Sequence, residues 1–369
     1  MRTRGAVVRR APGPYEVVDL EIEDPRAGEV QVRLVAAGLC HSDDHIAKGD
    51  SPVAVYPFAV GHEGAGVVSA VGPGVSELTE GDHVVFSFLP SCGRCRWCAS
   101  GRQNLCDDGA LAWMPPVTPR VRLAEDGSTV GQMCGVSAFM QTTTVSARSL
   151  VKIPVEIPLD KACLIGCGVA TGWGSAVNLA EVRPSQVVIV IGIGGIGINA
   201  VQGARHAGAG AVLAVDPVEF KREQARVFGA THVFATIGEA SDVARQLTNG
   251  QGADSAIVTV GVVEPEHVGQ AFAAIRKGGT TVVTGLGTNG VSAVPIDLSE
   301  LTLYQKRLQG SLFGGCNPTW DIRQLVDMYC QGALRLDELI TKTYTLDEIN
   351  EGYEDMHRGV NLRGVIMFE

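Results

Sequence analysis

An unbroken apolar run that opens into a glycine-rich turn is the most informative part of this chain: Val187-Val-Ile-Val-Ile191-Gly192-Ile-Gly194-Gly195-Ile-Gly197. The run predicts a buried strand, and the glycines predict a tight turn into a helix. Gly192 would permit the turn, Gly194 would let the backbone approach a pyrophosphate, and Gly197 would let helix and strand pack closely. Together with Gly195, these residues predict a dinucleotide site at the helix N-terminus, where free amide groups attract phosphates.

The chain around this motif alternates between predicted strands and helices. Besides the first run, four segments predict buried strands: Ala211–Val215, His232–Phe234, Ser255–Val260 and Thr280–Thr284. The stretches between them are typical of helices: Gly195–His206, Glu219–Phe228 and Glu264–Arg276. Alternating strands and helices predict βαβ units, and therefore an α/β fold with a doubly wound parallel sheet.

Asp216 directly follows the second of these strands, about 20 residues beyond the glycines. A carboxylate there would accept hydrogen bonds from an adenosine ribose and would repel a 2′-phosphate, which favours NAD over NADP. Lys221 and Arg222 lie close enough in sequence to weaken that preference. The alternative is a glycine-rich turn that is capped by an aspartate and binds no nucleotide.

The two ends of the chain follow different patterns. Short β-rich runs at Glu29–Ala37, Gly66–Val71 and Asp82–Phe88 are bounded by turn residues, which predicts a barrel-like domain of strands. The segment Asp321–Glu369 shows helical stretches and a final strand, Gly364–Phe368. A chain of 369 residues exceeds the size at which one hydrophobic core usually stops growing, so two domains are expected.

The composition excludes several classes of protein. Hydrophobic residues make up 45% and charged residues 19% of the chain, which is typical of a folded enzyme. The net charge of −10 argues against nucleic acid as a partner, because a phosphate backbone requires a clustered basic face. No signal peptide is recognisable, and the apolar run Val187–Ala204 is too rich in glycine to be read as a membrane span. We therefore expect a cytoplasmic protein with no membrane partner, whose ten cysteines are reduced.

Four of those cysteines lie within fifteen residues: Cys92, Cys95, Cys98 and Cys106. Two CxxC steps and one longer step can close a tetrahedral shell around zinc with no open position, so the spacing predicts a structural metal. Four reduced cysteines in one loop are the plainer alternative. A redox role is disfavoured because no thioredoxin-like βαβ pattern surrounds them.

Cys40, His62 and Cys167 could form a second metal shell. Two thiolates and one imidazole leave the fourth position of a tetrahedral zinc site open for water or substrate. The three residues stand in the motifs Cys40-His-Ser-Asp-Asp-His45, Gly61-His-Glu-Gly64 and Gly166-Cys-Gly168. Taken singly, a cysteine or histidine is more often a core residue than a ligand.

Together these motifs resemble those of the zinc-containing alcohol dehydrogenases of the medium-chain dehydrogenase/reductase family. The resemblance runs along essentially the whole chain and is most specific at Gly61–Gly66, in the four-cysteine segment and at Ile165–Val177. It implies a Rossmann domain inserted into a β-rich, GroES-like catalytic domain, with NAD and two zinc ions as cofactors. We expect residues 1–168 and 312–369 to form the catalytic domain, with a metal lobe at 92–106, and residues 169–311 to bind NAD.

The resemblance also assigns roles to single residues. Cys40, His62 and Cys167 become ligands of a catalytic zinc, Asp43 a carboxylate that orients His62, and Glu63 a carboxylate behind the metal.

The implied chemistry is Lewis-acid catalysis by zinc, which acidifies an alcohol so that hydride can leave for the nicotinamide. Ser42 would accept the proton first, and His45 would pass it toward solvent. A surface histidine without this role is the alternative for His45. The resemblance further implies four cofactor contacts: His41 and Arg363 with the pyrophosphate, and Thr171 and Lys221 elsewhere.

Three aromatic residues are expected near a small-molecule alcohol or aldehyde. Phe88 and Phe139 match positions that line the alcohol channel, and Trp113 is expected nearby; an apolar channel suits primary aliphatic or aromatic alcohols. Ordinary core packing is the alternative for these rings. The long segment from Cys106 to Cys167 resembles that of the dimeric members, so a homodimer is expected. The remaining cysteines are expected to be buried apolar residues: Cys134, Cys163, Cys316 and Cys330.

Three other functions stay open. The segments Asp216–Arg222, Gly310–Pro318 and Gly359–Val365 resemble an actinobacterial branch that includes nicotinoproteins, in which NAD stays bound and electrons leave to N,N-dimethyl-4-nitrosoaniline (NDMA) or to mycofactocin. Those proteins tend to have arginine and glutamate where this chain has His41 and Asp216, so exchangeable NAD is expected here. A thiol-dependent formaldehyde dehydrogenase would require a small thiol, and a non-catalytic zinc and nucleotide binding module would keep its effect without Cys40.

Overall fold

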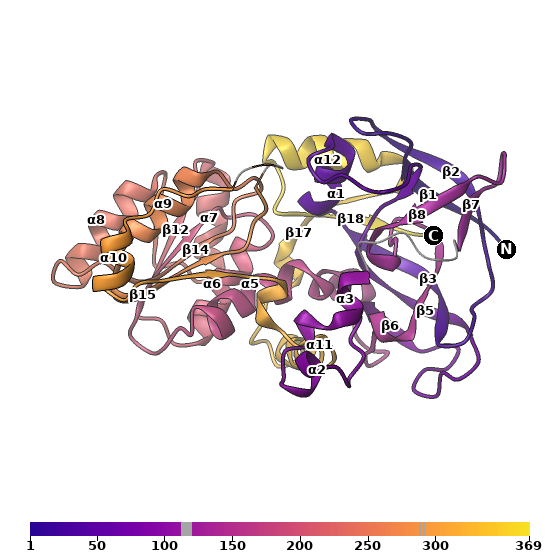
Figure 1. The fold of residues 1–369 in the computed structure, drawn as a ribbon, viewed down its shortest axis with the longest axis horizontal. Coiled ribbons are helices and arrows are strands. Elements are labelled where there is room, and N and C mark those ends of the chain that lie inside the picture. Colours follow the sequence, from indigo (N-terminus) through magenta and orange to yellow (C-terminus); the bar gives the residue numbers. More distant parts are fainter. Residues whose placement is uncertain (112–119, 288–289, 291) are drawn as a thin grey trace. The chain divides into compact units, whose positions relative to one another are not determined.

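The protein, described as a computed structural model at residues 1–111, 120–287, 290 and 292–369, folds as two compact units (Figure 1). The first unit comprises Met1–Cys167 and Asn317–Glu369, and the second comprises Gly168–Cys316. The second unit is therefore an insertion between two parts of the first.

The first unit consists mainly of strands: β1 (Arg2–Val8), β2 (Tyr15–Ile22), β3 (Glu29–Gly38), β4 (Phe58–Ala59), β5 (Glu63–Val71), β6 (His83–Phe86), β7 (Val121–Leu123), β8 (Thr129–Gln132), β9 (Thr142–Ser146), β10 (Leu150–Lys152), β17 (Ile340–Tyr344) and β18 (Arg363–Met367). Five of them close a barrel in the order β1-β2-β7-β8-β4. The others form a sheet in the order β10-β6-β5-β3-β18-β17, with β9 also paired to β3. Val7, Leu20, Val121 and Met140 fill the barrel, as expected for short strands whose apolar residues point inward.

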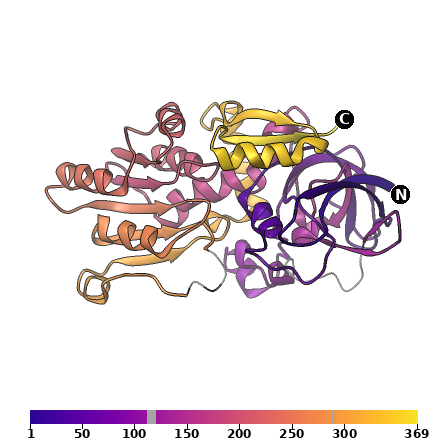
Figure 2. The same cartoon turned by 90° about the horizontal axis from the view of Figure 1, so that it is seen from above.

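The C-terminal segment completes this unit. Strand β18 pairs antiparallel with β3, so the end of the chain, yellow in Figure 2, lies against the N-terminal strands. The first unit has six helices among the described residues: α1 (His41–Lys48), α2 (Arg96–Ala99), α3 (Asp107–Leu111), α4 (Leu159–Ala162), α11 (Pro318–Cys330) and α12 (Ile349–Arg358).

The second unit is a parallel sheet with helices. Its strands are β11 (Val187–Ile191), β12 (Ala211–Val215), β13 (His232–Phe234), β14 (Ala253–Val258), β15 (Ile275–Val283) and β16 (Arg307–Gly310). Its helices are α5 (Gly168–Gly174), α6 (Gly197–His206), α7 (Glu219–Val227), α8 (Ile237–Leu247), α9 (Pro265–Ala274) and α10 (Leu298–Leu303). The strand order β13-β12-β11-β14-β15-β16 is that of a dinucleotide-binding Rossmann sheet. Every residue of β11 and β12 is buried, because helices cover both faces of the sheet. The expected fold class is confirmed.

Several boundaries differ from the expectations. Strand β14 ends at Val258, two residues earlier than expected. At Thr259 the backbone N–H still bonds the carbonyl oxygen of Ile191 at 2.8 Å, and the hydroxyl also contacts the carbonyl oxygens of Ile191 and Gly192 at 3.0 and 2.6 Å. The helix expected to reach Arg276 ends at Ala274, since Ile275 already pairs with Ala253 in the sheet.

The unassigned cysteines are not all buried. Cys134, Cys163 and Cys316 are buried as expected, but Cys330, the last residue of α11, is exposed. The expectation is wrong for Cys330 because it ends a surface helix.

In the described part of the chain, no single helix is long and apolar enough to cross a membrane, although the bent pair Leu159–Gly166 and Gly168–Leu179 meets the length and composition criteria.

Candidate active site

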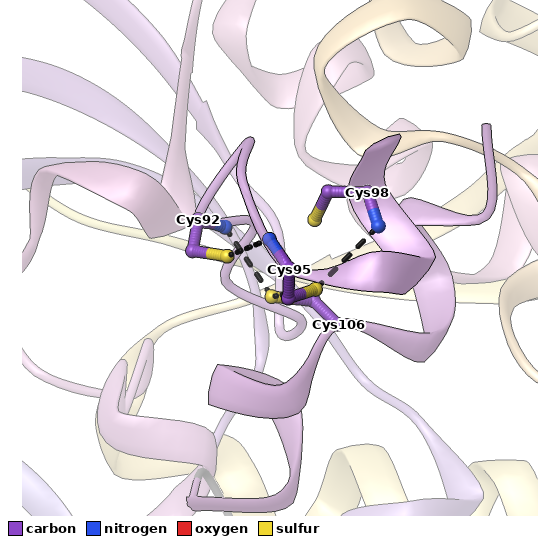
Figure 3. Close-up of side chains that lie close together, drawn as sticks. All are labelled: Cys92, Cys95, Cys98 and Cys106. Atoms are coloured by element: carbon purple, nitrogen blue, oxygen red, sulfur yellow. Dashed lines mark hydrogen bonds between the residues drawn. The ribbon is translucent and has the colours of Figure 1, made fainter. Parts of the chain in front are cut away.

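The four-cysteine segment folds so that its sulfur atoms gather (Figure 3). The sulfur atoms of Cys92, Cys95, Cys98 and Cys106 all lie within 4.8 Å of one another. Helix α2 begins directly after Cys95, whose sulfur accepts a hydrogen bond from the backbone N–H of Cys98. The Cys92 and Cys106 sulfurs accept from the N–H groups of Cys95 and Cys92, each at 3.3 Å. Backbone N–H donors favour the thiolate form, which is the form that binds metal.

The electrostatics of this cluster favour a bound cation. Backbone hydrogen bonds lower the pKa of Cys92 and lower that of Cys95 to about 6. Burial raises the pKa of Cys98 to about 12 and also raises that of Cys106. Four thiolates this close repel one another, so a divalent cation is needed to ionise all four. The donor set fits a tetrahedral zinc ion with no open position.

A second cluster lies wholly within the first unit. Cys40, His62, Glu63 and Cys167 each offer one ligand atom, and these atoms lie within 4.8 Å of one another. Cys40 precedes α1, His62 precedes β5, and Cys167 follows the 3-10 turn Cys163–Gly166. Cys40 is half-buried and the other three are buried. Two thiols and an imidazole fit a zinc site with a free position.

Asp43 holds the imidazole of His62. Its Oδ1 and Oδ2 atoms lie 3.3 and 3.2 Å from Nδ1 of His62, and Oδ1 also accepts a hydrogen bond from the N–H of Gly61 at 2.7 Å. Burial by itself would lower the pKa of His62, but the charges of Asp43 and Cys40 raise it well above its ordinary value. Because Asp43 occupies Nδ1, Nε2 is the nitrogen available to a metal.

Glu63, the carboxylate of this cluster, forms a buried ion pair with Arg363. Nη2 of Arg363 donates to Oε2 of Glu63, and also to the carbonyl oxygen of Leu39 at 3.1 Å. Burial raises the pKa of Glu63 to about 7, although the Arg363 guanidinium acts in the opposite direction. Both of these hydrogen bonds lie inside the first unit, so the role of Arg363 at a cofactor pyrophosphate stays a prediction.

Helix α1 carries three more of the predicted residues. His41 is its first residue and is half-buried. The hydroxyl of Ser42 lies 3.8 Å from the Cys40 sulfur. His45 is buried, and its Nδ1 lies 3.1 Å from Oδ2 of Asp50. The helix therefore places Ser42 beside the second cluster and His45 one turn further along.

The two predicted pocket residues have different surroundings. The ring of Phe88 packs edge-on against the imidazole of His62, with ring centroids 5.6 Å apart. Phe139 is fully buried and packs edge-on against Tyr353. Since no surface of Phe139 is exposed, its position gives the expected substrate contact no support. Trp113 lies outside the described residues.

In the second unit, the glycine turn joins β11 to α6. Gly192 has a φ of +87°, which residues with a Cβ rarely adopt. A Cβ at Gly197 would collide with the carbonyl oxygen of Gly192. A Cβ at Gly194 would have no described atom within 4 Å, so the backbone there is open to a ligand, and Gly195 follows it in the turn. These features match the geometry that lets a pyrophosphate approach a helix N-terminus.

Asp216 is hydrogen-bonded to the backbone on both sides of its carboxylate. Oδ2 accepts from the N–H of Ile193 at 2.8 Å, inside the glycine turn, and Oδ1 accepts from the N–H of Val218 at 2.9 Å. Each carboxylate oxygen has a further lone pair for a ribose hydroxyl. Arg222 donates to the carbonyl oxygens of Asp216 and Pro217, each at 2.8 Å.

The remaining predicted cofactor contacts are in helices of this unit. Thr171 is buried in α5, and its hydroxyl oxygen has no hydrogen-bond partner among the described residues. Such an unsatisfied buried hydroxyl indicates an absent ligand or water. Lys221 is half-buried in α7.

Two residues of the site were not found by sequence reasoning. Asp50 contacts His45. The sequence feature that could have indicated this contact is Gly49-Asp50, because a glycine at this position ends helix α1 and turns the chain back. The hydroxyl of Tyr353 donates to the carbonyl oxygen of Cys40 at 3.4 Å. No sequence signal links residues that lie 313 positions apart.

Two family models match the chain. The alcohol dehydrogenase GroES-like domain matches residues 26–155, and the zinc-binding dehydrogenase model matches residues 195–330. The first covers strands of the first unit together with the four-cysteine segment. The second begins in the glycine turn.

Similar proteins extend over the full length. An NDMA-dependent alcohol dehydrogenase of Amycolatopsis methanolica is 50% identical, covering 100% of this chain and 99% of the relative. A crystal structure of an alcohol dehydrogenase zinc-binding domain protein from Burkholderia ambifaria is 33% identical with a TM-score of 0.93, covering 100% and 99%. Benzyl alcohol dehydrogenase from Acinetobacter calcoaceticus is 30% identical with a TM-score of 0.91, covering 100% of both chains.

Proposed function

We propose that this chain, which belongs to the zinc-containing alcohol dehydrogenases of the medium-chain dehydrogenase/reductase family, transfers hydride reversibly between a primary alcohol and NAD. The proposal rests on the set of Cys40, His62 and Cys167, whose possible ligand atoms lie within 4.8 Å of one another. This set has the donor atoms of a zinc site with an open position, and Asp43 orients its imidazole.

Each residue around this set has a task in the proposed reaction. Zinc held there would supply a Lewis acid that acidifies the alcohol hydroxyl. Ser42 accepts the alcohol proton at its oxygen, and His45 passes that proton toward solvent. Phe88, which packs on His62, offers an apolar wall to aliphatic or aromatic alcohols. Glu63, fixed by Arg363, adds negative charge beside the metal ligands.

The second unit holds the NAD in this proposal. The amides at the start of α6 and the turn formed by Gly192, Gly194, Gly195 and Gly197 bind the pyrophosphate. Asp216 accepts hydrogen bonds from the adenosine ribose. The unsatisfied hydroxyl of Thr171 supports a contact with the cofactor, and His41, Lys221 and Arg363 supply cations.

A second zinc ion bound by the four-cysteine cluster completes the cofactors. Its four sulfurs leave no open position, so this ion stabilises the loop and takes no part in the reaction. None of the ten cysteines, all of which lie in the described part of the chain, is in a disulfide, which fits the reducing, cytoplasmic location that the proposal includes.

The test is NADH formation by purified, zinc-loaded protein that receives free NAD and a panel of alcohols. Many NADH molecules per chain with octanol or benzyl alcohol, without added thiol, are expected. Activity only with formaldehyde and a small thiol would instead indicate the thiol-dependent reaction, and no turnover under any condition would refute the proposal.

A second candidate differs in the fate of the NAD. The 50% identity to an NDMA-dependent alcohol dehydrogenase favours a cofactor that stays bound and passes its electrons to a separate acceptor. In that case, NADH does not accumulate in solution, and turnover starts only after the dye is added. The same assay with and without NDMA separates the two.

The proposal also includes a homodimer. All four residues of β16 are exposed, and β16 pairs only with β15 in the described sheet. Exposed apolar residues lie in or before this strand, including Leu298 at 71%, Leu303 at 75% and Leu308 at 37%. An unpaired strand edge with apolar neighbours is a common site of association with a second copy.

A further inference from the structure

His45 is a buried imidazole with a carboxylate partner. Its Nδ1 atom lies 3.1 Å from Oδ2 of Asp50. The side chain of His45 is only 4% exposed, whereas that of Asp50 is 31% exposed. The ring is therefore buried while its carboxylate partner reaches solvent, and the contact involves one specific ring nitrogen, Nδ1.

The end of helix α1 fixes this contact. The helix ends at Lys48, and Gly49 takes the left-handed conformation, with φ at 88°. The N–H of Gly49 then bonds the carbonyl oxygen of Ile46 at 3.2 Å, and the N–H of Ser51 bonds the carbonyl oxygen of His45 at 3.1 Å. These bonds turn the chain back over the last turn of the helix, which carries Asp50 to the ring of His45.

Other charged groups on the neighbouring elements are already engaged with one another. Asp44 of α1 lies 2.9 Å from Nζ of Lys48 and 2.9 Å from Nε2 of His357 in α12. Nζ of Lys48 also lies 3.1 Å from Nε2 of His357. Asp43 is bound to His62. Asp50, by contrast, is in direct contact with the ring of His45.

We propose that Asp50 is a positioning residue that sets the tautomer of His45. Its carboxylate accepts a hydrogen bond from Nδ1–H, so the neutral ring keeps its proton on Nδ1 and carries its lone pair on Nε2, which can then take a proton. When Nε2 takes the proton that leaves the alcohol through Ser42, the ring becomes an imidazolium, which the Asp50 anion stabilises. The imidazolium later releases one proton to water and returns to its neutral form. This inference rests on the proposed alcohol oxidation, but its structural part, the tautomer, does not.

The tautomer is measured first, by nitrogen NMR of the protein labelled with 15N-histidine, at a pH at which the ring is neutral. The variant His45→Gln identifies the signals of His45. The expected result is a protonated Nδ1 and an unprotonated Nε2 in the wild-type protein and in Asp50→Glu. In Asp50→Asn, the amide group can donate to Nδ1, which shifts the proton to Nε2.

The reaction is measured next, in a first turnover with benzyl alcohol and NAD, with a pH-indicator dye that reports proton release. Positioned acid–base groups contribute about 100-fold or more, and a wrong tautomer removes much of that effect. We expect Asp50→Asn to slow proton release about tenfold or more with an increased solvent deuterium effect, and Asp50→Glu to stay near wild type. The double variant with His45→Gln should be no slower than His45→Gln alone, because both changes affect one path.

Asp347→Asn is the control, since it removes an exposed carboxylate that pairs with Arg4 elsewhere in the first unit. This variant should change neither the tautomer of His45 nor the rate of proton release. A wild-type ring with its proton on Nε2 overturns the inference even if the Asp50 variants fail to fold. If the wild type oxidises alcohol and a folded Asp50→Asn variant releases protons at the wild-type rate, the inference about Asp50 is overturned but the proposed function is not. A wild type that oxidises no alcohol overturns the proposed function and the relay with it, whatever the tautomer.

Discussion

Cys40 is the residue on which the proposed chemistry depends most directly. It offers one of the two thiols of the open metal cluster and does not belong to the four-cysteine cluster. We expect Cys40→Ser to lose one of two zinc ions per chain and at least about 100-fold in turnover, because metal assistance contributes several kcal/mol. Metal analysis by mass spectrometry and the NADH assay measure the two effects.

The matched control is Cys134→Ser. Cys134 is a buried cysteine outside both metal clusters, so the Cys134→Ser protein should retain both zinc ions. A Cys40→Ser variant that still binds two zinc ions and turns over normally would contradict the assignment.

The buried pair of Glu63 and Arg363 predicts a stability effect. Removing one partner leaves an uncompensated buried charge, which costs about 3–5 kcal/mol. Arg363→Met should therefore lower the free energy of unfolding in urea by about that amount above pH 7. The double variant Glu63→Gln/Arg363→Met should recover much of the loss. If the single variant were as stable as wild type, the pair would not contribute as described.

At the scale of elements, one carboxylate ties α12 to β17. Asp355 lies 2.6 Å from Nζ of Lys342 and accepts a hydrogen bond from the hydroxyl of Tyr344 at 2.8 Å. The hydrogen bond from Lys342, followed by that from Tyr344, lowers the pKa of Asp355 below its ordinary value of 3.8.

This shift predicts a pH dependence. Since the folded-state pKa is the lower one, the stabilisation is complete above the ordinary pKa and is lost as the pH falls through the folded-state value. Asp355→Asn should therefore lower the melting temperature at pH 7, and the difference from wild type should narrow below about pH 4. A difference that is constant from pH 7 to pH 3 would show that the charge of Asp355 is not responsible.

Elements with a local signal could be predicted well from the sequence. The runs Val187–Ile191 and Ala211–Val215 coincide with β11 and β12, because a strand buried on both faces must be apolar throughout. The spacing of Cys92, Cys95, Cys98 and Cys106 likewise predicted that their sulfur atoms gather, because these cysteines are close along the chain. The end of the helix before Ile275 could not be predicted, because pairing with β14 overrides the helical pattern of that segment.

The contacts within the site also divide into those with a signal in the nearby sequence and those that depend on the tertiary fold. The motif residues Cys40, His62 and Cys167 come together. Their residue types suggested an open zinc shell beforehand, and the family resemblance assigned them as its ligands. The contact of Asp50 with His45 depends on a local turn, and the contact of Tyr353 with Cys40 depends on the return of the C-terminal segment. The second kind requires the folded structure.

For the whole molecule, the exposed edge at β16 predicts the assembly. Leu303→Lys/Leu308→Lys should reduce the mass in sedimentation from two chains to one, because charge at a strand edge opposes pairing with a second copy. Trp320→Lys is the control, since Trp320 is an exposed apolar residue of α11 in the first unit. A wild-type mass of one chain would rule out the proposed dimer, and a double variant that remains a dimer would place the interface elsewhere.

Hydride transfer from alcohol to nicotinamide is the central claim, and isotope transfer tests it whether or not the cofactor leaves the protein. Zinc-loaded protein would react with benzyl alcohol that carries deuterium on its alcohol carbon, and the nicotinamide cofactor would then be released by denaturation and weighed by mass spectrometry. We expect one deuterium in the reduced nicotinamide ring and none in the Cys40→Ser sample. Benzaldehyde formed without deuterium in the cofactor would contradict direct hydride transfer.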